Sequence, residues 1–231
     1  MGAGDTAVGL PAVSADFESE KKLAADAAAA LVEDGMTVGL GTGTTAGHFL
    51  RSLAARGLHL RCVATSPTTE RIALEVGLFV EPFDGPHALT QLDIAVDGAD
   101  QISPDGWIVK GGGGAHTREK VVAVTAARFV VIASSDKLVE RIRQPVPLEL
   151  LPYGVRATLA RLSHADLRDA PPTPDGGVLA DWRGPVEDPA ALAALLEHTP
   201  GVVEHGLFPP DLVSDVLVGR GDSVEALSRA G

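Results

Sequence analysis

The chain has 231 residues, 45% hydrophobic and 22% charged, which fits a globular protein with a substantial buried core. Its formal net charge of -12, with lysine and arginine scattered along the chain, argues against a nucleic-acid partner. A few local N–H groups and one or two lysines can still hold a phosphate. The single cysteine, Cys62, excludes an intramolecular disulfide, and no apolar run is long enough to span a membrane. Without a secretory signal, we expect a cytoplasmic protein whose residues 1–16 form a flexible tail.

Helices and strands alternate in the first part of the chain. Helices are predicted over residues 17–34, 46–57, 69–77 and 118–128, and strands over residues 36–40, 58–65, 78–82, 92–96 and 129–133. Gly35, Gly57 and Gly77 end the first three helices. This alternation predicts an α/β protein with a Rossmann-like, doubly wound parallel sheet and right-handed crossovers.

The pattern changes after residue 144, where Pro145, Pro147 and Pro152 interrupt the rhythm. Two predicted helices, within residues 158–162 and 188–197, then alternate with extended segments, which indicates a small α+β subdomain over residues 145–206. Asp215 to Gly219 is apolar enough for a last strand that returns to the first sheet. We therefore expect a catalytic domain made of residues 17–144 and 207–231, with the subdomain inserted between them.

Most of the candidate catalytic residues lie between Leu92 and Lys120. Asp97 and Asp100 follow an apolar strand, and open α/β sheets bind ligands at the carboxyl ends of their strands. Lys110, at the end of a second short strand, precedes four glycines, Gly111 to Gly114, and Glu119 comes soon after them. Glycines are costly to order, and close approach of a ligand is the best reason for such a run.

Each of these residues also has a plainer interpretation. Asp100 could serve a turn, Lys110 could be an exposed charge, and the glycines could form a flexible hairpin tip. With Thr117 as the predicted N-cap, Glu119 falls in the first helical turn, where a carboxylate is common because it complements the helix dipole. Two acids could bind Mg²⁺, but Lys110 would compete for them and no third acid completes a shell, so we expect no metal and no other cofactor.

A second candidate site is the GTGTT loop, Gly41 to Thr45, between a predicted strand and a predicted helix. Its N–H groups, with the hydroxyls of Thr42, Thr44 and Thr45, suit an anion at a helix N-terminus. The loop matches neither a Walker A sequence nor a full dinucleotide fingerprint, and a tight turn with a threonine cap is about as well supported. Ser66 and Thr69 could reach a ligand, although capping a helix is the better interpretation for at least one of them. Lys137, at the end of another strand, is a possible ligand contact.

A carboxylate base, further acids, a lysine and a phosphate cradle suit proton abstraction next to a carbonyl, because the enediolate that forms needs positive charge and donors nearby. The motifs GLGTGTT, SPTTERIALEVGL, DIAVDGAD, KGGGGAHTREKVV, PVPLELLP and DPAALAALLEHTPGVVEHGLF resemble those of the ribose-5-phosphate isomerase type A family. They recur in the family's order from about Lys21 to Gly219, so the resemblance covers nearly the whole chain.

The resemblance implies an isomerase that converts ribose 5-phosphate to ribulose 5-phosphate without metal, in the non-oxidative pentose phosphate pathway. It implies that Glu119 is the general base, that Asp97 and Asp100 open the furanose and bind hydroxyls, and that Lys110 supports the enediolate. It further implies a ferredoxin-like subdomain and a homodimer or homotetramer. The residues implied to hold the substrate or its phosphate are Lys21, Thr42, Gly43, Thr44, Thr45, Gly111, Gly112, Gly113 and Lys137.

Two departures from the family pattern matter. Gln101 stands where DGADE is usual, which removes one acid, and the glycine loop continues as GGGGAH rather than GGGAAL. Two alternatives therefore stay open: an isomerase of another phosphosugar on the same scaffold, and a sugar-phosphate sensor that binds without turnover. The intact Glu119 argues against the sensor, whereas Gln101 mildly supports it.

Overall fold

The computed structural model describes residues 16–227. The predicted tail lies outside the described residues except for Asp16, which caps the first helix by accepting a hydrogen bond from the Ser19 N–H at 3.3 Å. No helix within residues 16–227 is long and apolar enough to cross a membrane.

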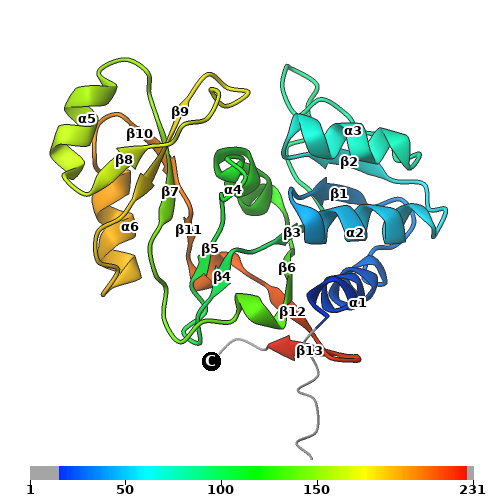
Figure 1. The fold of residues 1–231 in the computed structure, drawn as a ribbon. Coiled ribbons are helices and arrows are strands. Elements are labelled where there is room, and N and C mark those ends of the chain that lie inside the picture. Colours follow the sequence, from blue (N-terminus) through cyan, green and yellow to red (C-terminus); the bar gives the residue numbers. More distant parts are fainter. Residues whose placement is uncertain (1–15, 228–231) are drawn as a thin grey trace, which may run out of the picture.

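A six-stranded sheet forms the centre of the larger part of the molecule (Figure 1). Its strand order is β13-β12-β6-β3-β1-β2, and every neighbouring pair is parallel except β12 and β13. The strands are β1 (Thr37–Leu40), β2 (Arg61–Ala64), β3 (Ile94–Gly98), β6 (Phe129–Ser134), β12 (Asp215–Arg220) and β13 (Ser223–Leu227). The predicted α/β class and the return of the last parallel strand to this sheet are confirmed. The antiparallel edge strand β13 was not predicted.

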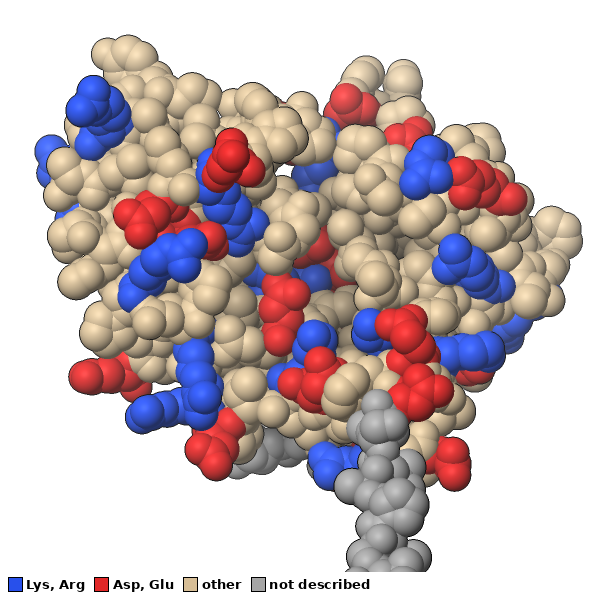
Figure 2. Space-filling model, viewed as in Figure 1, with Lys and Arg blue, Asp and Glu red and all other residues tan. Residues whose placement is uncertain are grey.

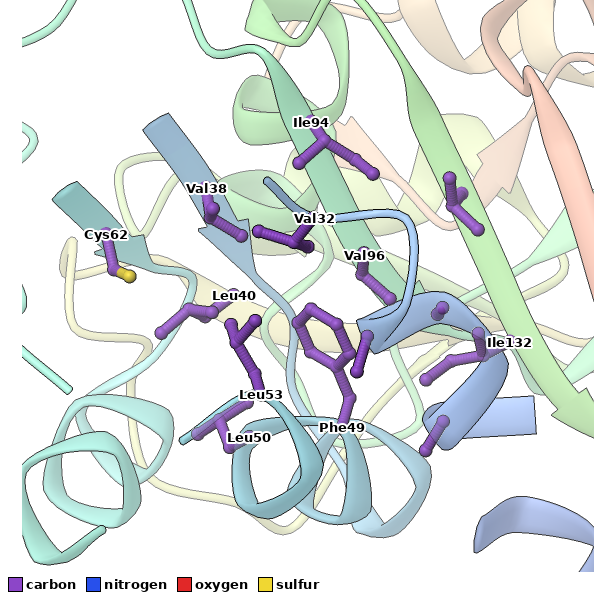
Figure 3. Close-up of a cluster of buried hydrophobic side chains, with 14 of the residues drawn as sticks. Val32, Val38, Leu40, Phe49, Leu50, Leu53, Cys62, Ile94, Val96 and Ile132 are labelled. Atoms are coloured by element: carbon purple, nitrogen blue, oxygen red, sulfur yellow. The ribbon is translucent and has the colours of Figure 1, made fainter. Parts of the chain in front are cut away.

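Helices cover both faces of this sheet. The helices α1 (Phe17–Ala29), α2 (Thr44–Ala54) and α3 (Pro67–Glu75) share one apolar cluster with side chains of the sheet, and Figure 3 shows Phe49 of α2 pointing toward Val96, with Leu50 beside Leu53. On the other face, α4 (His116–Thr125) packs on a second cluster. Because side chains alternate along a strand, Ile94 and Val96 face the first cluster, whereas Ala95 faces the second and Asp97 points the same way.

The smaller part is an antiparallel sheet in the order β10-β7-β9-β8. In chain order its elements are β7 (Val146–Leu150), α5 (Val155–Leu162), β8 (Ala165–Leu167), β9 (Val178–Trp182), α6 (Pro189–Glu197) and β10 (Val202–His205). This βαββαβ order confirms the expected ferredoxin-like arrangement. The exact division into residues 17–144 with 207–231 and residues 145–206 stays a proposal.

A third, three-stranded sheet lies between these two parts in Figure 1. Its strands, in the order β11-β5-β4, are β4 (Gln101–Ile102), β5 (Ile108–Val109) and β11 (Leu207–Phe208). The strand β11 follows the small sheet in the chain and pairs with β5, which directly precedes Lys110. The short 3-10 helices η1 (Ser135–Lys137) and η2 (Pro210–Leu212) follow β6 and β11.

Three local predictions are wrong. The first helix ends at Ala29 rather than Asp34, because the N–H groups of Leu31 and Val32 bond carbonyls three residues back and tighten the last turn. Residues 78–82 form only an isolated bridge between Val80 and Cys62 rather than a strand.

The third concerns the start of α4, where Ala115 rather than Thr117 is the N-cap residue. Thr117 lies inside the first turn, and its hydroxyl donates to the Glu149 carboxylate on β7. Glu119 nevertheless lies in the first turn, as predicted.

Candidate active site

A hollow lies at the carboxyl ends of β1 and β3. It is lined by Lys21, Thr42, Gly43, Thr44, Thr45, Gly98, Ala99, Asp100, Lys110, Gly111, Gly112, Gly113, Glu119 and Lys137. The space-filling view shows acidic and basic atoms together in the hollow between the two lobes (Figure 2). The structure thus brings every predicted site residue except Asp97 to one surface, although they come from six separate stretches of chain.

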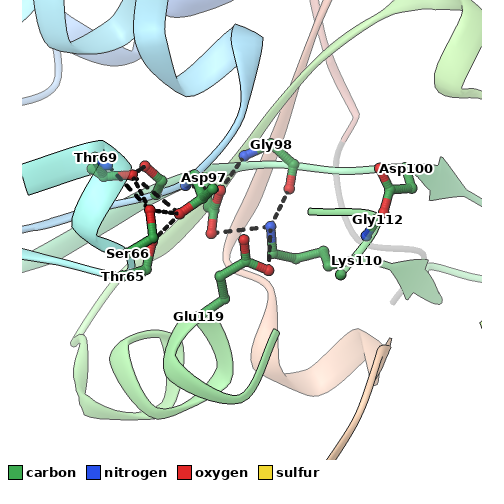
Figure 4. Close-up of polar contacts among 12 residues, drawn as sticks. Thr65, Ser66, Thr69, Asp97, Gly98, Asp100, Lys110, Gly112 and Glu119 are labelled. Atoms are coloured by element: carbon green, nitrogen blue, oxygen red, sulfur yellow. Dashed lines mark hydrogen bonds and ion pairs between the residues drawn. The ribbon is translucent and has the colours of Figure 1, made fainter. Parts of the chain in front are cut away.

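Lys110 and Glu119 form the buried floor of the hollow, with side chains only 3% and 5% exposed. The Lys110 ammonium lies 3.0 Å from Asp97 Oδ2 and 3.3 Å from Glu119 Oε2, and it donates to the Gly98 carbonyl at 2.6 Å (Figure 4). It also lies 5.8 Å from the centre of the Phe208 ring, which covers it from the β11 side. The fold therefore places a cation directly against two of the three acids that the sequence analysis identified, Asp97 and Glu119.

Asp97 is held from several directions and does not line the hollow. Its Oδ1 accepts hydrogen bonds from the N–H groups of Thr42 at 3.0 Å and Gly98 at 2.7 Å, while its Oδ2 faces Lys110. The neighbouring loop must approach closely, because a Cβ on Gly41 would lie 2.2 Å from the Asp97 carboxyl. The Asp97 carboxylate thus connects the GTGTT loop to Lys110.

The pKa of Glu119 is raised to about 8: burial is the largest cause, the charge of Lys110 opposes it, and the charges of Asp97 and Asp100 add to the rise. The Glu119 Oε2 atom lies within ion-pair distance of Lys110, yet it has no hydrogen-bond partner among the described residues. A buried carboxyl that has a pKa near neutrality and lines a hollow suits general base catalysis.

The ammonium of Lys110 stays charged although burial alone would lower its pKa. The negative charges of Asp97 and Glu119 outweigh burial, and the net effect is a raised pKa of Lys110. For Asp97, burial raises the pKa, and the Lys110 charge together with the two N–H donors opposes that rise. The Lys110 ammonium therefore lies as one positive charge between two buried carboxyl groups.

Asp100 lies apart from this floor. It is exposed at the rim, where its Oδ2 accepts a hydrogen bond from the Gly112 N–H at 2.8 Å, and Figure 4 shows the two side by side. The glycine loop itself folds closely over α4, because a Cβ on Gly111 (φ 101°) would lie 2.7 Å from the buried His116 ring. This explains in part why a glycine run occurs here.

The GTGTT loop lines the end of the hollow away from the floor formed by Lys110 and Glu119. Gly43 (φ 108°) precedes α2, so the first turn of α2 presents N–H groups that have no acceptor within the helix. Lys21 on α1 and Lys137 on η1 line the same end, and they also pair with Glu18 at 2.6 Å and Asp136 at 3.0 Å. Two lysines and a helix N-terminus create a positive potential suited to an anion.

The Thr42 hydroxyl is used inside the protein. It lies 2.8 Å from Thr65 Oγ1, 2.9 Å from Ser66 Oγ and 3.1 Å from Thr69 Oγ1 (Figure 4). Ser66 caps α3 by accepting from the Thr69 N–H, as predicted, and Thr69 donates to the Gly41 carbonyl. This hydroxyl cluster fixes the loop, which leaves Thr44 and Thr45 as the threonines at the helix N-terminus.

Sequence reasoning missed several residues of the site. Gly98 and Ala99 line the hollow, Thr65 joins the hydroxyl cluster, Phe208 covers Lys110, and Arg168 reaches the glycine loop from the small sheet. None of these carries a local signal, because each acts through a contact with a distant stretch of chain. Within residues 16–227, no three His, Cys, Asp or Glu side chains converge as a metal site would require.

Gln101, the departure at DGAD, does not reach this hollow. Its amide exchanges two hydrogen bonds with the backbone of Arg143, one from Nε2 to the carbonyl and one from the N–H to Oε1, both at 2.8 Å. An amide has both the donor and the acceptor for this pair, whereas a carboxylate has only acceptors. The residue thus fastens β4 to the segment that leads into β7.

The family model for ribose 5-phosphate isomerase A (phosphoriboisomerase A) matches residues 61–223. The chain belongs to this family. Ribose-5-phosphate isomerase A of Caulobacter vibrioides is 42% identical over 226 residues, covering 91% of this chain and 98% of that protein. Members of the family are aldose–ketose isomerases, and the chain is an enzyme of that class.

Solved structures of the family agree with this assignment. Ribose 5-phosphate isomerase A of Methanocaldococcus jannaschii superposes with a TM-score of 0.83 at 34% identity, covering 90% of this chain and 97% of that one. A D-ribose-5-phosphate isomerase in complex with phospho-erythronic acid gives a TM-score of 0.86 at 33% identity, covering 93% of this chain and all of that one. The resemblance drawn from the motifs is confirmed.

Proposed function

We propose that this protein interconverts ribose 5-phosphate and ribulose 5-phosphate with Glu119 as the general base, as a step of the non-oxidative pentose phosphate pathway. The observation that carries the proposal is the buried Glu119 carboxyl with a pKa of about 8, beside the Lys110 ammonium at the floor of a hollow. The other end of that hollow has two lysines and a helix N-terminus, as a phosphosugar requires.

The reaction follows from these two ends. With the open-chain aldose bound by its phosphate, Glu119 takes the proton from C2, and the electron pair of that C–H bond forms the C1–C2 double bond. The carbonyl oxygen at C1 becomes an enediolate oxygen, and the fixed positive charge of Lys110 stabilises it in a site with little water. The C2 hydroxyl gives up its proton and the C1 oxygen takes one up, so the negative charge of the enediolate moves from the C1 oxygen to the C2 oxygen. Glu119 then returns its proton to C1, the electron pair of the C1–C2 double bond forms the new C1–H bond, and an electron pair of the C2 oxygen forms the carbonyl of the ketose.

The acids have different parts in this scheme. Asp97 keeps Lys110 charged and aimed, since its oxygens are already engaged with Lys110, Thr42 and Gly98. Asp100, exposed at the rim, is the acid placed to meet sugar hydroxyls and to assist ring opening. The family relative in complex with phospho-erythronic acid supports a phosphorylated sugar acid or sugar as the kind of ligand, because that ligand has a carboxylate and a phosphate at its two ends.

The test is conversion of ribose 5-phosphate by the purified protein beside Glu119→Gln. The variant keeps the shape and one oxygen of the side chain but removes the base, so kcat should fall about 10³-fold. Binding of phospho-erythronic acid, measured by calorimetry, should change less than threefold because no proton is transferred on binding.

Three results would count against the proposal. Near-normal turnover by Glu119→Gln would remove Glu119 from its role. Binding of ribose 5-phosphate without any turnover by the wild type would favour the sensor. Turnover of another phosphorylated aldose with a higher kcat/KM would reassign the substrate.

A further inference from the structure

Arg168 connects the small sheet to the active-site glycine loop. It directly follows β8, its backbone N–H donates to the Leu179 carbonyl at 2.9 Å, and its side chain is only 17% exposed. From there Nη1 donates to the Gly111 carbonyl at 3.0 Å and to the Gly112 carbonyl at 3.2 Å. One guanidinium nitrogen thus holds two consecutive peptide groups.

The opposite side of the guanidinium is anchored. Nε and Nη2 of Arg168 both donate to Asp181 Oδ1 on β9, at 2.9 Å and 2.6 Å, and Asp181 is buried. The guanidinium is planar and presents its donors in a fixed fork. With two donors committed to a buried carboxylate, the direction of the third is set by the small sheet.

Peptide geometry transmits this direction to the hollow. In a trans peptide the C=O and the N–H point in opposite directions. The Gly111 carbonyl shares its peptide group with the Gly112 N–H, which donates to Asp100, and the Gly112 carbonyl shares its group with the Gly113 N–H. Holding both carbonyls on the Arg168 side therefore turns both N–H groups away from it, and Gly112 and Gly113 both line the hollow.

Such a hold is needed because glycine has the greatest backbone freedom of any residue. Four consecutive glycines would otherwise sample many peptide orientations, and donors must already be aimed when negative charge develops on the substrate. A donor on each carbonyl also polarises the N–H of the same peptide group. Asp181 neutralises the charge of Arg168. Arg168 therefore acts on the glycine loop by orienting its peptide groups rather than by adding positive charge to the site.

We propose that Arg168 is a positioning residue, which fixes the peptide groups of Gly111 to Gly113 so that their N–H groups hold Asp100 and stabilise the enediolate. The proposal rests on the isomerase function proposed above. It makes the small sheet a working part of the active site.

The decisive comparison is Arg168→Ala against Arg183→Ala. Arg183 also faces Asp181, with Nη2 3.5 Å from Oδ2, and it pairs with Asp166 at 3.4 Å. Both changes remove a guanidinium from Asp181, but of these two arginines only Arg168 is hydrogen-bonded to the glycine loop. We expect Arg168→Ala to lower kcat about 100-fold, the effect of losing one oriented donor to a developing oxyanion. Arg183→Ala should keep kcat within twofold.

Three further measurements separate positioning from mere support of the fold. Binding of inorganic phosphate should stay within twofold in Arg168→Ala, since the other end of the hollow is unchanged, whereas phospho-erythronic acid should bind at least tenfold more weakly. Added guanidinium ion at millimolar concentration should restore part of the kcat of Arg168→Ala and none of that of Glu119→Gln. Arg168→Lys keeps the charge but not the fork, so it should still lose at least tenfold in kcat while retaining its melting temperature.

The proposal is overturned if kcat of Arg168→Ala or Arg168→Lys stays within threefold of wild type. It is equally overturned if Arg168→Ala loses phosphate binding and kcat together and guanidinium restores neither, because that result means general disruption. Should Arg168→Ala not fold, the kcat of Arg168→Lys alone decides. Failure of the proposed function is a different result, because the wild type itself would then not turn over ribose 5-phosphate.

Discussion

The two ends of the hollow differ in how much water reaches them. At the floor, Asp97, Lys110 and Glu119 are buried against α4 and the Phe208 ring. At the other end, Gly43 and Thr44 are exposed, and the Lys137 side chain keeps 32% of its surface in solvent. Charges interact several times more strongly at a buried site than at an exposed one, because water screens the latter. Under the proposed function, the buried floor is the end suited to proton transfer and the exposed end is the one suited to capture of the phosphate.

The largest effect should come from removing the charge at the floor. In Lys110→Met the side-chain length is kept, but two buried carboxyl groups lose their cation. We expect kcat to fall about 10²–10³-fold and the protein to lose about 3 kcal/mol of unfolding free energy. Turnover assays with ribose 5-phosphate measure kcat, and urea unfolding measures the free energy of unfolding. A variant with wild-type kcat would show that Lys110 does not stabilise the enediolate.

The pH dependence of kcat/KM should report the ionisation of Glu119 at the buried floor. Glu119 works as a base only when ionised, so kcat/KM should rise with pH up to about 8, roughly tenfold per unit below it, and then level off. Because Lys110 lowers the pKa of Glu119, the residual activity of Lys110→Met should rise through a higher pH. A profile for the wild type that is flat between pH 6.5 and 9 would contradict the raised pKa.

Folding stability should follow the same titration. The pKa of Glu119 is raised on folding, so the stability associated with its protonated form is complete near pH 4.5 and lost as the pH rises through about 8. Glutamine cannot ionise. The melting temperature of Glu119→Gln, compared with that of the wild type, should therefore become relatively higher between pH 5 and pH 9. If the difference in melting temperature between Glu119→Gln and the wild type stays the same from pH 5 to pH 9, burial does not raise the pKa of Glu119.

A smaller effect is expected at the exposed end. Lys137→Ala removes one charge near the proposed phosphate, and solvent screens that charge. We expect KM to rise about tenfold with kcat within twofold, at the low end of charged hydrogen bonds. Lys22→Ala is the matched control, since Lys22 is exposed and pairs with Asp26 instead. If kcat of Lys137→Ala falls as much as that of Lys110→Met, the two ends of the hollow do not differ in their contribution to kcat.

The smallest effect should come from chelation. Lys110 already neutralises the floor, so EDTA should leave the rate of isomerisation unchanged. Loss of activity that Mg²⁺ restores would give Asp97 and Asp100 a metal-binding role instead.

Much of the fold could be predicted because its signals are local. Short apolar strands separated by amphipathic helices with glycine ends define the parallel sheet, and prolines mark the change to the small sheet. The predictions that failed depend on contacts made elsewhere. Thr117 looks like a cap in sequence, but its hydroxyl is used by Glu149, and residues 78–82 look like a strand but form only one bridge to β2.

The sequence by itself determined which residues are the candidates for the chemistry, because Asp97, Lys110, the glycine run and Glu119 lie within one short stretch with a family pattern. Only the tertiary structure decided how they are arranged. It turned Asp97 away from the hollow toward Lys110, directed the Thr42 hydroxyl into the protein, and brought Arg168 to the glycine loop, 56 positions away in the chain. Distances, burial and the resulting pKa of Glu119 arise from segments that are far apart in the chain, and local sequence cannot encode where such segments meet.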